Sequence, residues 1–196
     1  LSLILSKIYL MNLKTKRIIK LIVLLIFFTN EVFAQFSGFA LYNRQGNTTT
    51  YLIDENENIA HTWNLSTECN YTVLLKDNGN IVRGTKNNIQ TGGTNNSLGG
   101  AADAGRVQEI DPNGNVVWDF IYSSSSVLSH HDICLIGDNV LLTAWEVKSQ
   151  AELINAGFTG NVSNSGKWPT HFVEIEGNSN TGTAQIVWEW HIWDHL

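Results

Sequence analysis

The fold is most readable in one stretch of the chain, Ser129-His130-His131-Asp132-Ile133-Cys134-Leu135-Ile136-Gly137-Asp138-Asn139-Val140-Leu141-Leu142. An apolar run, a Gly-Asp-Asn turn and a second apolar run follow one another, which is the pattern of a β-hairpin. Two histidines and an aspartate begin the first strand. Because side chains alternate across a strand, we expect His130 and Asp132 on one face and His131 on the other. The hairpin would then present a histidine that Asp132 orients or charges.

Hairpins of two types alternate along the chain. Copies of one type are recognisable at residues 51–63, 108–120 and 173–190, the last with a short insertion. A second type, at residues 71–83, overlays residues 130–142 without gaps. A pair of hairpins therefore recurs about every 57 to 65 residues.

The paired repeat indicates the architecture. Two hairpins make a four-stranded sheet, which is the unit of a β-propeller blade. A β-sandwich could use the same hairpins, but it would not need them to repeat as pairs. From residue 36 onward no helical pattern exceeds two turns, and the best lies at residues 150–156. We predict an all-β fold, a β-propeller of four-stranded blades, over residues 35–196. The Asp-x-Asn-Gly-Asn turns supply the positive φ that such hairpins need.

The number of repeats is too small for a closed propeller. The sequence holds about two and a half blades, whereas propellers close with four to eight. An open stack would leave a blade face and its apolar surface in water. We therefore expect the N-terminal part of a longer propeller, truncated at its C-terminus, which by itself would be poorly stable and inactive.

The first 34 residues have the three parts of a secretory signal peptide. A basic region follows Met11, the apolar run at residues 21–28 comes next, and Ala34 ends a small-residue cleavage site. The alternative is a membrane anchor, but the apolar run of about 8 residues is far shorter than the roughly 20 that span a bilayer. We predict initiation at Met11, cleavage after Ala34, and export to the periplasm or the outside, with no membrane attachment afterwards.

Composition adds a few limits. The net charge of -6 and the pI of about 5.4 do not point to nucleic acid as a partner. Cys69 and Cys134 are the two cysteines, and either a disulfide or free thiols would suit them. Residues 87–105 read as a long surface loop, and residues 150–169 as a short helix followed by a Gly/Ser/Asn loop. The oligomeric state is left open.

Several motifs carry a family resemblance. They are His130-His131-Asp132-Ile133, Gly105-Arg106-Val107-Gln108-Glu109-Ile110-Asp111, Val116-Val117-Trp118-Asp119-Phe120 and Trp188-Glu189-Trp190-His191-Ile192-Trp193-Asp194-His195-Leu196. With these motifs the chain resembles the N-terminal part of the arylsulfotransferase (aryl-sulfate sulfotransferase) family. The resemblance implies a six-bladed, exported propeller that moves a sulfuryl group from a phenolic sulfate ester to a phenol. It further implies a transiently sulfated histidine and no nucleotide donor or other cofactor.

Sulfuryl transfer of this kind would use histidines in two ways. A neutral imidazole nitrogen can attack sulfur and hold the group covalently, which splits one transfer into two easier steps. Cations stabilise the charge that grows on the oxygens, and a second histidine can act as general acid and base. The catalytic candidates are His130, His131, Asp132 and His195, and the substrate-binding candidates are Arg83, Arg106 and Trp193. The nucleophile itself could also lie in blades beyond this sequence.

Structural roles remain open for each candidate. We expect a structural role for His131 more than for His130, and also for His61 and His171, while His191 is undecided.

One alternative function is a non-catalytic exported propeller that binds a glycan or a protein on its central face. A metal-dependent hydrolase or lyase using His130, Asp132 and His195 is weaker, since no close ligand pair is present. We predict no metal at the site and no cofactor, and the need for calcium is left open.

Overall fold

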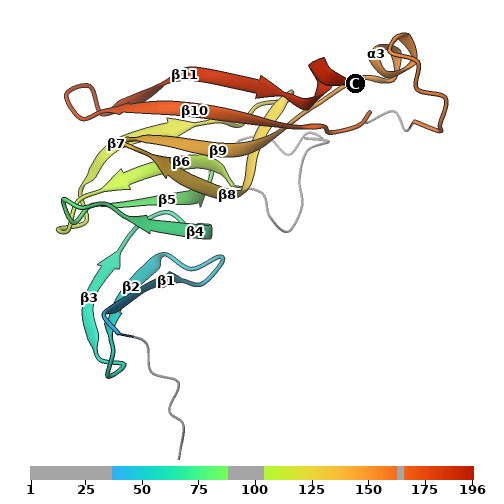
Figure 1. Cartoon of the computed structure of the whole chain (residues 1–196). Helices are drawn as coiled ribbons and strands as arrows, with labels where there is room; N and C mark the ends of the chain where they lie inside the picture. Colours follow the sequence, from blue (N-terminus) through green and yellow to red (C-terminus); the bar gives the residue numbers. More distant parts are fainter. Residues whose placement is uncertain (1–36, 88–103, 163–165) are drawn as a thin grey trace, which may run out of the picture. The chain divides into compact units, whose positions relative to one another are not determined.

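Antiparallel β-strands dominate the part of the chain that the computed structural model describes, residues 37–87, 104–162 and 166–196 (Figure 1). The signal peptide predicted in residues 1–34 and most of the loop predicted at residues 87–105 lie outside these residues. Residues Gly38–Leu196 form one unit. The predicted all-β class is confirmed.

The strands and helices follow in chain order. Their bounds are β1 Phe39–Asn43, β2 Thr49–Asp54, β3 Ile59–Asn64, β4 Cys69–Leu75, β5 Ile81–Lys86, β6 Gly105–Ile110, β7 Val116–Ile121, β8 Val127–Ile136, β9 Asn139–Glu146, α3 Gln150–Asn155, β10 Thr170–Asn178, β11 Thr183–His191 and the 3-10 helix η1 Ile192–His195. Helix α3 falls where the sequence predicts a short helix, and Ser149 and Glu152 form a capping box at its start. Among the described residues, no helix is long and apolar enough to cross a membrane.

Neighbouring strands in the sheets are mostly neighbours in sequence. Strands β1, β2 and β3 form a three-stranded sheet, and the other eight strands run in the order β4-β5-β6-β7-β11-β10-β9-β8. This larger sheet consists of two antiparallel meanders, β4 to β7 and β8 to β11, which meet through one parallel pair, Asp119 with Thr183. The first strands, β4 and β8, also touch, because Thr72 Oγ1 donates a hydrogen bond to Asp132 Oδ1. The sheet is therefore nearly closed, like a barrel.

The sequence repeat is visible in backbone detail. The hairpins β2–β3, β6–β7 and β10–β11 carry a β-bulge at the same repeat position, after Leu52, Glu109 and Glu174. In two of the turns an aspartate closes the loop, since Asp54 Oδ1 and Asp111 Oδ1 each accept hydrogen bonds from two backbone N–H groups. These hairpins are thus structural copies of one another.

The gapless overlay of the second hairpin type is wrong at the turn. Strands β4 and β5 close at the pair Leu75–Ile81, whereas β8 and β9 close at Ile136–Asn139. The β8–β9 turn is therefore the two residues Gly137 and Asp138, and Asn139 already belongs to β9. A longer turn in one hairpin shifts the pairing, and an ungapped alignment cannot register the shift.

A repeated tryptophan links each hairpin of the first type to the next hairpin of that type. Trp63, on β3, is 2% exposed and donates from Nε1 to the Asp111 carbonyl oxygen at 3.0 Å. Trp118, on β7, is 3% exposed and packs directly on Gly177 of β10. Asp111 and Gly177 are neighbouring positions of the repeat turn, so each tryptophan packs on the same part of the module that follows it. Trp188 is the third copy and is 47% exposed.

Candidate functional site

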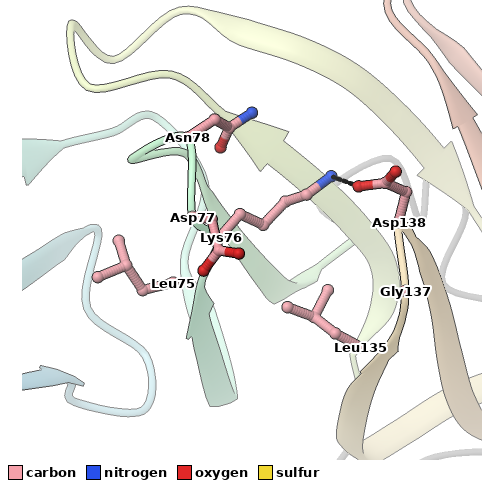
Figure 2. Close-up of a pocket in the computed structure, with 7 residues that line it drawn as sticks. All are labelled: Leu75, Lys76, Asp77, Asn78, Leu135, Gly137 and Asp138. Atoms are coloured by element: carbon pink, nitrogen blue, oxygen red, sulfur yellow. Dashed lines mark ion pairs between the residues drawn. The ribbon is translucent and has the colours of Figure 1, made fainter.

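The hollow drawn in Figure 2 lies at the turn end of the strands, away from the predicted catalytic histidines. It has a volume of about 240 Å³ and is lined by Leu75, Lys76, Asp77, Asn78, Leu135, Gly137 and Asp138. Lys76 Nζ crosses it to Asp138 Oδ1 at 3.8 Å, and the same amine pairs with Glu109 Oε2 at 3.0 Å. Its cation is thereby neutralised, so the chemistry is better sought at the histidine end of β8.

A bulge in β8 brings the two adjacent histidines together. His130 pairs with Thr143, but the next pair is Ile133 with Leu142, so His131 and Asp132 are extra residues. His131 has φ 49°, in the left-handed region that few non-glycine residues adopt. The Nδ1 atoms of His130 and His131 are consequently 2.8 Å apart. The expectation that the two rings point to opposite faces is wrong, because the bulge interrupts the alternation.

The two rings have different surroundings. His130 is 8% exposed and stacks on Trp145 at 4.0 Å between ring centroids. Burial, and next the charge on His131, lower the pKa of His130 from 6.5 to about 4. His131 is exposed. The sequence analysis expected a structural role for His131 more than for His130, but His130 is the buried member of the pair.

The contact between the Nδ1 atoms restricts the protonation states. A hydrogen bond between two imidazole nitrogens needs one donor and one acceptor. Since His130 is neutral at pH 7, its Nδ1 can accept the proton that His131 Nδ1 carries. In that tautomer the Nε2 of His131 has the lone pair that a nucleophile requires, whereas the opposite assignment, with His130 Nδ1 as the donor, fits the same contact.

Asp132 shapes the bulge. Its Oδ1 accepts hydrogen bonds from Thr72 Oγ1 on β4 and from the backbone N–H of Ile133 at 2.9 Å. Thr143 completes the arrangement, because its hydroxyl donates to the His130 carbonyl oxygen at 2.6 Å. In this arrangement Asp132 orients the histidine pair through the backbone and joins the first strands of the two meanders.

The two predicted cations are used inside the fold. Arg83 is fully buried, and its guanidinium donates to Thr67 and, at 3.2 Å, to Thr50 Oγ1. Burial lowers the pKa of Arg83 to about 10. Arg106 binds Asp119 with two hydrogen bonds, one of them 2.7 Å from Nε to Oδ1. These positions give both arginines structural roles in place of the substrate contacts that the sequence suggested.

The C-terminal candidates lie on another part of the sheet. His195, in η1, is exposed and stacks on Trp190 at 4.9 Å, and Lys148 Nζ lies 5.1 Å from the ring centroid of Trp193. Trp190 and His130 occupy one row across the meander, three strand spacings apart. Three spacings amount to about 14 Å. The structure therefore does not bring His195 or Trp193 beside the histidine pair.

A second cluster escaped the sequence reasoning. His171 and His191 stand opposite each other in the β10–β11 register, with parallel rings 4.7 Å apart. Glu146, at the end of β9, has Oε1 3.2 Å from His191 Nδ1. The residues are far apart in sequence, and only the strand pairing brings them together. The sequence did contain one signal for this cluster: one histidine lies at the start of a hairpin strand and another at the end of its partner strand.

Both cysteines are free thiols, Cys69 buried and Cys134 exposed. No family model matches this chain, and no curated protein matches it either. The family resemblance stays an expectation.

Proposed function

We propose that the two meanders are blades of a β-propeller, with β4 and β8 as the inner strands. The sequential strand order within each meander supports this architecture, since a propeller blade is a four-stranded antiparallel sheet. The contact of Asp132 with Thr72 supports it too, because the inner strands of adjacent blades are neighbours. The three-stranded sheet β1-β2-β3 would be part of a preceding blade.

The exposed face of β11 supports a further blade. Ile186, Val187 and Trp188 are 41%, 45% and 47% exposed, whereas the equivalent Trp63 and Trp118 are covered by the module that follows them. Apolar side chains exposed together on a strand usually mark a contact surface. We infer that another copy of the repeat covers this face in the complete protein, which is exported as its predicted signal peptide implies.

We propose that the protein transfers a sulfuryl group from a phenolic sulfate ester to a phenol. The single observation that carries this proposal is the contact between a buried, neutral imidazole, His130, and an exposed one, His131. His131 Nε2 would attack sulfur while the bond from sulfur to the aryl oxygen breaks and the phenolate leaves. The sulfated ring would be cationic, and its Nδ1–H would donate to His130 Nδ1.

The second half of the reaction reverses these steps. An acceptor phenol would attack sulfur, and the bond from nitrogen to sulfur would break. The acceptor would lose its proton to the phenolate released in the first step or to solvent. His131 is thereby restored. An apolar hollow of about 160 Å³ beside Asp132, which Phe172 and Leu141 help to line, offers the aryl ring a place to pack. No step requires a nucleotide or a metal.

The test is a fluorogenic aryl sulfate incubated with the purified complete protein, including the further blade inferred above, with and without added phenol. We expect phenol to accelerate release of the fluorescent product. His131→Ala should abolish release, because it removes the attacking nitrogen, while His130→Gln should slow it by disturbing the tautomer of His131. His61→Ala is the matched control, since His61 is on β3 and its ring contacts the Pro112 carbonyl oxygen and not the histidine pair. Absence of release from folded protein over a panel of aryl sulfates would refute the proposal.

A binding module is the second candidate. The stacked pair of Trp190 and His195 offers aromatic surface of the kind that glycans contact. Under this alternative the protein would bind a glycan without turnover. Glycan retention that Trp190→Ala reduces, together with no aryl sulfatase or transfer activity, would favour it.

A further inference from the structure

We propose that Glu146, His171 and His191 form a zinc-binding site, distinct from the His130–His131 pair. One ligand atom from each residue lies within 4.8 Å of the others. Ligand atoms around tetrahedral zinc, at about 2.0–2.2 Å from the metal, are roughly 3.5 Å apart, so modest side-chain rotations would complete the site. Two imidazoles and a carboxylate are a common zinc ligand set, with one position left for water.

Strand pairing holds these ligands in place. His171 pairs directly with His191, and on the other side of β10 it pairs with Ala144. Glu146 is two residues beyond Ala144 on β9, so its side chain points to the same face of the sheet. All three ligands therefore project from one face at one end of adjacent strands, where the backbone is held by the sheet hydrogen bonds. Ligands on strands are placed more accurately than ligands on loops.

His171 supplies an independent indication of a ligand. Its side chain is fully buried, and its Nδ1 has no hydrogen-bond partner among the described residues. Buried polar atoms are nearly always paired, so an imidazole nitrogen without a partner calls for one.

A hydrogen-bonded partner already fixes the other nitrogen of His171. Its Nε2 is 2.9 Å from the Tyr122 hydroxyl, which in turn donates to Glu189 Oε1 at 3.3 Å. Burial, with the charge of Glu189, raises the pKa of Tyr122, so the phenol remains protonated. In this chain Nε2 carries the proton of His171 and Nδ1 has the lone pair. Metal-binding histidines commonly have an outer hydrogen-bond partner of this kind.

Charge at the site permits a divalent cation. Lys148 Nζ binds Glu146 Oε2 at 2.8 Å, which leaves Oε1 as the oxygen that faces His191. The positive Lys148 weakens the attraction for a cation, but Glu146 and Glu189 together outweigh it. The competing explanation is that a proton occupies this place, with a protonated His191 bonded to Glu146. The side chain of His191 is 28% exposed, so an ion can reach the site from solvent.

Cobalt is a suitable probe, because tetrahedral Co²⁺ absorbs visible light strongly and Zn²⁺ displaces it. We expect chelator-treated protein to bind one Co²⁺ with these bands and to lose them on addition of Zn²⁺. Glu146→Gln and His191→Gln should each weaken binding at least tenfold, since each removes a ligand. His195→Gln is the matched control, because it removes a histidine four residues from His191 that is not part of the cluster.

Circular dichroism identifies any variant that fails to fold. Because His191 is partly exposed, we expect His191→Gln to disturb folding less than Glu146→Gln. Zinc should also raise the melting temperature of the wild-type protein and of His195→Gln, but not that of His191→Gln. The proposal is overturned if the folded wild-type protein binds no stoichiometric Co²⁺ or Zn²⁺. It is equally overturned if binding survives unchanged in both ligand variants. Neither readout depends on sulfuryl transfer.

Discussion

Replacing Gly177 by alanine tests how the two meanders pack. Gly177 is on β10, and the indole of Trp118 from β7 lies directly over it. A Cβ atom at position 177 would be 2.1 Å from Trp118 Nε1 and 2.4 Å from Cε2, closer than real Cβ contacts allow. Because Trp118 is only 3% exposed, the ring cannot move into solvent without opening the core.

The cost has two sources. Overpacking a core with one methyl group typically costs about 1–3 kcal/mol. Displacing the indole would also break its 2.7 Å hydrogen bond to the buried Glu109 carboxylate, and a hydrogen bond to a charged group contributes about 1.5–3 kcal/mol. We therefore expect Gly177→Ala to lower the free energy of unfolding by about 3 kcal/mol. In a domain of this size that corresponds to a melting temperature lower by roughly 10 °C.

Gly84→Ala is the matched control. Gly84 also lies within a strand, β5, and has an ordinary φ, but a Cβ there would meet only Asn70 Cβ at 3.8 Å, which is normal contact. Its expected change is below about 1 kcal/mol, of either sign. Urea denaturation followed by tryptophan fluorescence and circular dichroism measures both variants. If Gly177→Ala is as stable as Gly84→Ala, the packing of Trp118 between the meanders is refuted.

Three further predictions concern how much single side chains contribute to the stability of the protein. Because the pKa of His130 is about 4 when folded and 6.5 when unfolded, the unfolded chain binds the extra proton first as the pH falls. The free energy of unfolding should therefore drop by up to about 3 kcal/mol between pH 6.5 and pH 4, and urea titrations at both pH values should show less of this drop in His130→Gln. Arg83→Met should cost about 2–4 kcal/mol, because it leaves the buried oxygens of Thr67 without their donor, whereas Arg106→Met, which breaks a partly exposed pair, should cost about 1 kcal/mol. Equal losses in chemical denaturation would contradict the assignment of a buried structural role to Arg83. Ser149→Ala removes the capping box of α3 and should cost about 1 kcal/mol, seen as a small decrease in melting temperature; no change would mean that α3 does not contribute to global stability.

The candidate site was only partly predictable. The sequence indicates a functional role for His130 and His131, because two adjacent histidines begin a strand. Their relative placement depends on the β8 bulge, which Thr143 on β9 and Thr72 on β4 stabilise through hydrogen bonds across strands. Such contacts have no periodicity that a sequence pattern could reveal. For the same reason the burial of Arg83 could not be anticipated, since exposure is the ordinary state of an arginine.

Sequence alone determined the repeat, the turns of the first hairpin type and the strand class, because these depend on contacts between residues close together in the chain. Asp54 and Asp111 close their turns with backbone groups two and four residues ahead, so the motif contains its own hydrogen-bond partners. Tertiary structure alone decided which residues meet across strands. Glu146, His171 and His191 belong to three strands, and only the register of those strands brings their side chains together. Turn geometry sets the register within a hairpin such as β10–β11, but β9 and β10 are joined by a long connection that contains α3, so their register depends on how the whole sheet packs.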